Sequence, residues 1–120
     1  MNKIMTNFKM LAVFILVLFT SCRENHLPKS INIANNKVYF SLKDNNYKEV
    51  LFGTDLIGNW KNFPMKKVDT TWVISFFNPH KEVQYKFFIN QHYWVRDALN
   101  EQKIVLKPPQ EGYNSIVVFK

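Results

Sequence analysis

Residues 82–90 read EVQYKFFIN and give the clearest indication of the fold class. The alternation places Val83, Tyr85, Phe87 and Ile89 inward and Gln84, Lys86 and Phe88 outward. Because successive side chains of a strand point to opposite faces, this alternation predicts a half-buried β-strand. The strand should pack one face on a core and turn Lys86 outward.

Similar short strands extend outward from this one in both directions. Alternating or β-rich segments occupy residues 38–43, 48–54, 71–77, 103–106 and 115–119, and Asn-, Gly- and Pro-rich turns separate them. Helical periodicity is poor everywhere after Cys22. The pattern predicts one all-β domain over residues 37–120, an immunoglobulin-like sandwich of about seven strands. With a single cysteine, it has no Cys-Trp-Cys pattern of antibody domains.

The N-terminal residues resemble an export signal. Lys3 and Lys9 precede ten apolar residues at positions 10–19, and Thr20-Ser21-Cys22 follow. This boundary resembles the bacterial lipobox, although Phe19 stands where Leu is usual. We therefore expect residues 1–21 to be a signal peptide and Cys22 to carry the lipid, a multi-chain (palmitate-type) anchor. The alternative is an uncleaved anchor helix, for which the apolar run is short against the roughly 20 residues of a membrane span.

Residues 22–36 are expected to be the lipidated cysteine and a tether that holds the domain off the bilayer. The alternative left open is that part of it, around residues 30–33, pairs as a first edge strand. The residue directly after Cys22 is Arg23, whereas a signal for retention in the inner membrane has Asp at that position. The localisation expected is the cell envelope with the outer membrane favoured, and the side that it faces is left open.

Charge excludes some partners. The chain carries a formal charge of +7, and removal of residues 1–21 leaves fourteen basic against nine acidic residues, or +5. The basic residues are spread out, and Lys66-Lys67 is their one adjacent pair. A nucleic-acid binder would show a denser stripe, so no nucleic-acid partner is expected.

Catalytic and metal chemistry have little support in the sequence. The three histidines, His26, His80 and His92, lie in the tether and in turns, without a second ligand at metal-binding spacing. There is no nucleophile elbow, phosphate-binding loop or dinucleotide fingerprint. We therefore expect no enzyme, no catalytic residues, no metal and no cofactor.

Large aromatic residues at turns carry the functional signal. Trp60 follows Gly58-Asn59, and Tyr93-Trp94 follow the turn at residues 90–92. The alternative is a structural role, in which each tryptophan folds back to cap an end of the sandwich. The functional interpretation is sugar stacking, because the C–H face of a pyranose lies flat on an indole. Burying roughly 80 Å² of apolar surface per stack would contribute about 2 kcal/mol.

Residues 49–119 resemble a known family in the order and spacing of five pieces. The pieces are Val50-Leu51-Phe52-Gly53, Asn59-Trp60 with Phe63-Pro64-Met65, Trp72-Val73 with residues 84–90, Trp94-Val95-Arg96-Asp97, and residues 114–118. They are similar to family-48 carbohydrate-binding modules, including the glycogen-binding domain of the AMP-activated protein kinase β subunit. The resemblance implies an early-set sandwich that binds α-1,4-linked glucan without acting on it.

The resemblance also implies the binding residues. The stacking tryptophans map to Trp60 and Trp94, the strand lysine to Lys86 and the asparagine near the last strand to Asn114. The hairpin before Trp94 is one residue longer than in the family and lacks its glycine, so Tyr93 is a candidate to share the stacking role. Residues 107–112, KPPQEG, depart most from the family pattern. Trp72 is assigned to the core.

Two functions stay open at this point. The first is a lipid-anchored, non-catalytic module that binds glycogen, starch or maltooligosaccharides near a membrane. The second is a sandwich that keeps the fold but serves as a structural or interaction module of an envelope complex, with a protein partner and no sugar.

Overall fold

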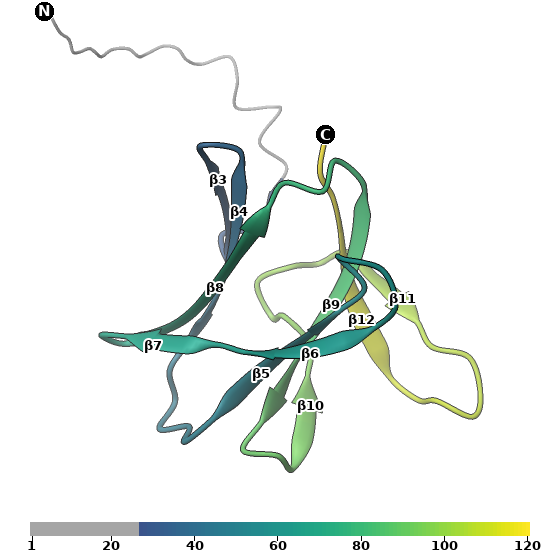
Figure 1. Ribbon diagram of the computed structural model, residues 1–120. Helices are drawn as coiled ribbons and strands as arrows, with labels where there is room; N and C mark the ends of the chain where they lie inside the picture. Colours follow the sequence, from purple (N-terminus) through teal and green to yellow (C-terminus); the bar gives the residue numbers. More distant parts are fainter. Residues whose placement is uncertain (1–26) are drawn as a thin grey trace, which may run out of the picture.

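The computed structural model describes residues 27–120 and forms a β-sandwich (Figure 1). The expected signal peptide at residues 1–21, together with Cys22 and His26, lies outside the described residues. The ten strands are β3 (Ile31–Ala34), β4 (Lys37–Lys43), β5 (Val50–Thr54), β6 (Lys61–Pro64), β7 (Lys66–Val68), β8 (Thr71–Phe77), β9 (Glu82–Ile89), β10 (Tyr93–Val95), β11 (Lys103–Val105) and β12 (Tyr113–Val118). The predicted all-β sandwich is confirmed. Over residues 27–120 no helix has the length and apolar character to cross a membrane.

Two antiparallel sheets form the sandwich. The six-stranded sheet runs β11-β12-β9-β5-β6, with β10 also paired to β9, and the four-stranded sheet runs β3-β4-β8-β7. The chain passes from β6 in one sheet to β7 in the other across the single buried residue Met65 (Figure 1). Such a short crossing holds the two sheets together along this side.

The alternation that predicts β9 is present in the structure. Val83, Tyr85, Phe87 and Ile89 are fully buried between the sheets, whereas Gln84, Lys86 and Phe88 are only partly covered. The strand lies in the middle of its sheet, with β5 paired along one side and β12 and β10 along the other. One face of β9 therefore belongs to the core, and the other forms the outer face of the sheet.

Aromatic rings make the centre of the core. Phe40 of β4 lies 4.5 Å from Phe52 of β5 and 5.0 Å from Tyr85 of β9, measured between ring centroids. Trp72 of β8 is buried as predicted, and its Nε1 donates to Asp44 Oδ1 at 2.9 Å. The Phe40 contacts join both sheets, because β4 belongs to one and β5 and β9 to the other.

The predicted start of the sandwich at residue 37 is too late. Strand β3 pairs with β4 from Ile31 opposite Phe40 to Ala34 opposite Lys37, and both Ser30 and Ile31 are buried. The alternative of an edge strand around residues 30–33 is close to what the structure shows. Only Ile31 of β3 is buried, and Asn32, Ile33 and Ala34 are exposed, so the strand shows no clear alternation of buried apolar positions.

A buried polar cluster fastens this first segment to the rest. The Asp97 carboxylate accepts hydrogen bonds from the hydroxyls of Ser30 and Tyr85, the latter at 2.7 Å. The Asn100 side chain donates to the Tyr85 hydroxyl at 2.9 Å. Burial, and then the negative charge of Asp97, raise the pKa of the Tyr85 hydroxyl. The segment before β3 is thus tied to the loop after β10.

Candidate functional site

The outer face of the six-stranded sheet collects the outward side chains of neighbouring strands. In the strand pairing, Lys86 of β9 lies opposite Gly53 of β5, and Gly53 lies opposite Asn62 of β6. Phe88, the next residue of β9 on the same face as Lys86, lies opposite Trp94 of β10. Directly paired residues of an antiparallel sheet share a face. The register therefore places Gly53, Asn62, Lys86, Phe88 and Trp94 on one surface of the sheet.

Gly53 is the floor of this surface. A Cβ atom built on Gly53 would lie 2.7 Å from Cζ2 of Trp60, 2.8 Å from Cζ3 of Trp94 and 2.9 Å from Oδ1 of Asn62. Any side chain at this position would occupy the space that both indoles now fill. The glycine therefore lets Trp60, from the loop before β6, and Trp94, from strand β10, meet over the same point of the sheet.

Trp60 ends the loop between β5 and β6. Leu56 buries the start of this loop, and Gly58 turns the chain at a φ of 123°. The indole Nε1 of Trp60 donates to Oδ1 of Asn62 at 3.1 Å, so the ring is held against the start of β6. The side chain is 39% exposed. Trp60 is therefore neither buried in the core nor fully exposed to solvent.

Trp94 is placed by the hairpin between β9 and β10. Asn90 and Gln91 both take positive φ angles, and the His92 N–H donates to the Ile89 carbonyl at 2.8 Å. Oδ1 of Asn90 also accepts from the backbone N–H of Lys48 at 2.7 Å, which fixes the turn. Asn tolerates positive φ better than most residues, which accounts for a turn without glycine.

The two indoles meet at a steep angle. Trp94 stacks on Phe88, with the ring centroids 4.6 Å apart and the planes at 29°. Trp60 and Trp94 lie with centroids 6.2 Å apart and planes at 68°. Trp94 is 41% exposed, close to the value for Trp60. The pair forms an angled aromatic surface that is backed by Phe88 and open to solvent.

Polar groups border this surface on the β12 side. Lys86 follows Gln84 on the outer face of β9, and its Nζ lies 3.8 Å from where a Cβ on Gly112 would be. Partial burial lowers the pKa of the Lys86 ammonium. Nδ2 of Asn114 donates to Oε1 of Gln84 at 2.9 Å. Asn114 is only 7% exposed, so its carboxamide acts largely by orienting Gln84.

The structure brings four of the five predicted binding residues to one face. Trp60, Lys86, Trp94 and Asn114 lie on the outer face, whereas Tyr93 pairs with the inward-facing Ile89 and therefore lies on the opposite face from Trp94. Sequence reasoning did not select the residues that support the tryptophans. Those residues are Gly53, Asn62 and Phe88, and Gln84, which accepts from Asn114, was not selected either. Alternation already turned Gln84 and Phe88 outward, but the roles of Gly53 and Asn62 depend on strand register.

Such a surface can bind a flat apolar face and satisfy hydroxyl groups around it. The indoles supply the apolar contact, and Lys86, Gln84 and Asn62 supply donors and acceptors. Among residues 27–120, no three His, Cys, Asp or Glu side chains gather as a metal site would require. Binding by stacking and hydrogen bonding is the chemistry that these residues can perform.

Comparisons with known proteins support the fold. No protein-family model and no curated protein matches the sequence. Solved structures do match. The pullulanase of Klebsiella pneumoniae complexed with maltotriose is 15% identical, with a TM-score of 0.55 over 78% of this chain and 10% of that one. A pullulanase mutant of Paenibacillus barengoltzii complexed with maltotetraose is 16% identical, with a TM-score of 0.53 over 73% of this chain and 14% of that one.

A putative α-amylase of Salmonella typhimurium is also similar, at 20% identity and a TM-score of 0.50, over 72% of this chain and 14% of that one. At these identities the likeness shows the fold alone. This chain spans only 10–14% of the three structures, so the similarity concerns a small part of each. The chain shares its sandwich fold with parts of the two pullulanases and of the putative α-amylase.

Proposed function

We propose that this protein is a lipid-anchored, non-catalytic module that binds α-1,4-linked glucan on the outer face of its six-stranded sheet. The observation that carries the proposal is the meeting of Trp60 and Trp94 over Gly53, with Lys86 beside them. Two half-exposed indoles held in fixed positions are costly to leave in water and well suited to stacking on sugar rings.

The angle between the indoles supports an α-linked chain. Their planes lie at 68°, so two sugar rings that stack on them must also be turned relative to each other. An α-1,4-linked glucan curves and turns its successive rings, whereas a flat β-linked ribbon keeps them nearly coplanar. The similarity in fold to parts of pullulanases points to the same class of ligand.

Affinity electrophoresis in gels with and without glycogen tests the binding directly. We expect glycogen to retard the wild-type chain, and the double variant Trp60→Ala/Trp94→Ala to migrate alike in both gels. Phe77→Ala is the matched control, because Phe77 is a 73% exposed aromatic residue of the other sheet and should leave the retardation unchanged. Equal mobility of the wild type in both gels would favour the interaction-module alternative.

The anchor is proposed from the sequence alone, through Cys22. Cys22→Ala should prevent lipidation and leave a precursor that is uncleaved or leaves the membrane fraction. Pulse labelling with palmitate and fractionation of the envelope would measure both effects. A Cys22→Ala chain that is processed and sediments with outer membranes like the wild type would rule out the lipoprotein proposal without affecting the glucan proposal.

A further inference from the structure

Within residues 27–120, half of strand β8 has one edge to which no strand pairs. Along one side β8 pairs with β4 over its full length, but on the other side β7 pairs only with Thr71, Trp72 and Val73. Among the strands that the structure describes, none pairs with residues 74–77 on that side. An edge with unpaired backbone groups is a ready template for another strand.

The backbone groups that face this edge can be assigned. The Asn78 N–H donates to the Asn36 carbonyl at 2.8 Å, toward the β4 side. Because the N–H and C=O groups of successive residues in a strand point to alternate sides, Ser75 and Phe77 direct theirs toward the free edge. An occupant with its own backbone donors and acceptors, that is, an extended peptide, would complete this pairing.

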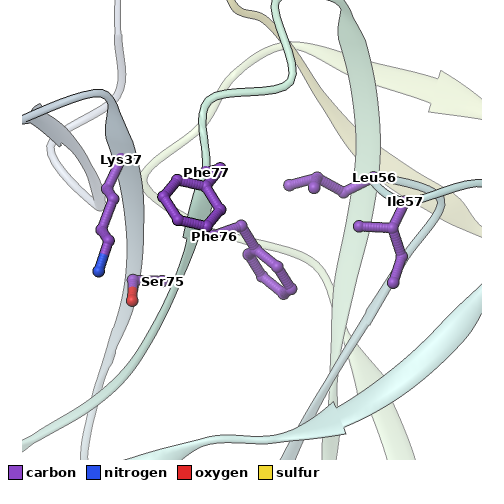
Figure 2. Close-up of a pocket in the computed structure, with 6 residues that line it drawn as sticks. All are labelled: Lys37, Leu56, Ile57, Ser75, Phe76 and Phe77. Carbon is purple, nitrogen blue, oxygen red and sulfur yellow. The ribbon is translucent and has the colours of Figure 1, made fainter.

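An apolar pocket lies beside the same edge (Figure 2). Its volume is about 330 Å³, and its lining residues are Lys37, Leu56, Ile57, Ser75, Phe76 and Phe77. Figure 2 shows Phe76 of β8 and Leu56 of the loop after β5 reaching toward each other across it. Ile57 is 54% exposed. The pocket would accept an apolar side chain from a strand that pairs with Ser75 and Phe77.

The positive charge beside the pocket indicates which kind of partner would bind there. Lys37 is the one charged residue among the six that line the pocket, and its Nζ lies 5.5 Å from the centre of the Phe77 ring. Residues 27–120 contain thirteen basic and eight acidic residues, so a second copy would bring positive charge to positive charge. Complementary charge favours an acidic occupant instead.

We propose that the free edge of β8 and its pocket bind an extended, acidic segment of a partner protein as an added strand, with an apolar side chain in the pocket and a carboxylate facing Lys37. This mode of recognition uses backbone hydrogen bonds for affinity and pockets for specificity. The edge belongs to the four-stranded sheet and the tryptophans to the outer face of the other, so both ligands can be bound together.

The first test uses a defined peptide, EVEVEVE with blocked ends, and its counterpart KVKVKVK. Isotope-labelled residues 23–120, which include the whole sandwich, are titrated to millimolar peptide and followed by amide NMR. We expect EVEVEVE to shift the Ser75 and Phe77 amides and to slow their hydrogen exchange. KVKVKVK should bind at least about fivefold more weakly.

Variants separate the proposed contact from nonspecific attraction. Lys37→Glu should reverse the preference between the two peptides. Ser75→Pro removes a free-edge donor without touching the β4 ladder and should weaken EVEVEVE at least about fivefold. Lys43→Glu, at the far end of β4 opposite Thr71, is the matched control and should bind like the wild type. Equal loss in Lys37→Glu and Lys43→Glu would overturn the proposal.

Fusing the peptide to the chain compensates for a weak affinity of the free peptide. The Lys120 carbonyl lies 2.9 Å from Nδ1 of His80, just beyond the end of β8, so the chain ends close to the free edge. EVEVEVE fused after Lys120 through about ten Gly and Ser residues, which span roughly 17 Å, is present at an effective concentration near millimolar. We expect protection of the Ser75 and Phe77 amides. Unprotected amides in this fusion, or a dimer of the unfused chain paired through β8, would contradict the proposal.

Discussion

Gly53 shows how one residue without a side chain organises the candidate site. Trp60 comes from the loop before β6 and Trp94 from strand β10, and both place their rings under 3 Å from where a Cβ of residue 53 would be. Neither indole is in the core, so the glycine serves the surface and not the fold. Changes at this position should therefore separate binding from stability.

Gly53→Ala tests this separation. The added methyl would lie under 3 Å from both indoles, so the rings must move outward and lose their common geometry. We expect glucan affinity to fall about tenfold, or about 1.4 kcal/mol. The free energy of unfolding should change by less than about 1 kcal/mol, since Ala also restricts the unfolded chain. Calorimetric titration beside urea denaturation measures both, and a large loss of stability with intact binding would contradict the role of Gly53.

Lys86 predicts how binding depends on pH. Burial lowers the pKa of its ammonium from 10.5, because the charged form is poorly solvated there. If the ammonium donates to a sugar hydroxyl, affinity should be full at neutral pH and should fall as the pH rises through the lowered pKa, before an ordinary lysine titrates. Lys86→Ala should bind about fivefold more weakly, a loss of about 1 kcal/mol, and should lack this alkaline decline. Parallel pH profiles for wild type and variant would refute the contact.

Among the elements, the connection after β4 is fixed by a carboxylate. Asp44 accepts from Trp72 Nε1 at 2.9 Å and pairs with Lys67 Nζ at 2.9 Å, so it joins β4, β7 and β8. The hydrogen bonds from Lys67 and then Trp72 lower its pKa from 3.8 to about 2. A carboxyl group whose pKa is lower in the folded state stabilises the fold above its unfolded pKa. That contribution is lost as the pH falls from about 4 to about 2.

Asp44→Asn should therefore flatten the acid dependence of stability. We expect the free energy of unfolding of the variant to fall less steeply than that of the wild type between pH 4 and pH 2, with the two values converging at the acidic end. Urea denaturation at several pH values provides the measurement. The exposed Glu101→Gln serves as control, and a wild-type profile indistinguishable from that of Asp44→Asn would refute the assignment.

The elements also show which parts of the fold the sequence can predict. Strands with several alternating positions, such as β4, β8 and β9, are evident because their inner residues are apolar. Strands β6, β7 and β10 have only three or four residues, too few to show a period. Strand β3 turns a single residue, Ile31, into the core, so its sequence resembles a tether.

At the scale of the whole molecule, the candidate site depends on contacts that the sequence only partly indicates. Alternation turns Lys86 outward, and the family resemblance pairs it with Trp60, Trp94 and Asn114. The position of Tyr93 depends on the register of β10 against β9, which places it opposite Ile89 and away from Trp94. The role of Gly53 depends on the pairing of three strands, β6, β5 and β9. Register of this kind is a property of the folded sheet.

Calorimetric titration with maltoheptaose, beside thermal melts of the same proteins, tests the central claim most directly. We expect Trp60→Ala and Trp94→Ala each to weaken maltoheptaose binding about tenfold or more, a loss of about 1.4 kcal/mol or more. Their unfolding should shift far less than that of Trp72→Ala, a core change expected to cost about 3–5 kcal/mol. Absence of binding heat from the wild type, or melting of both surface variants as severe as that of Trp72→Ala, would contradict it.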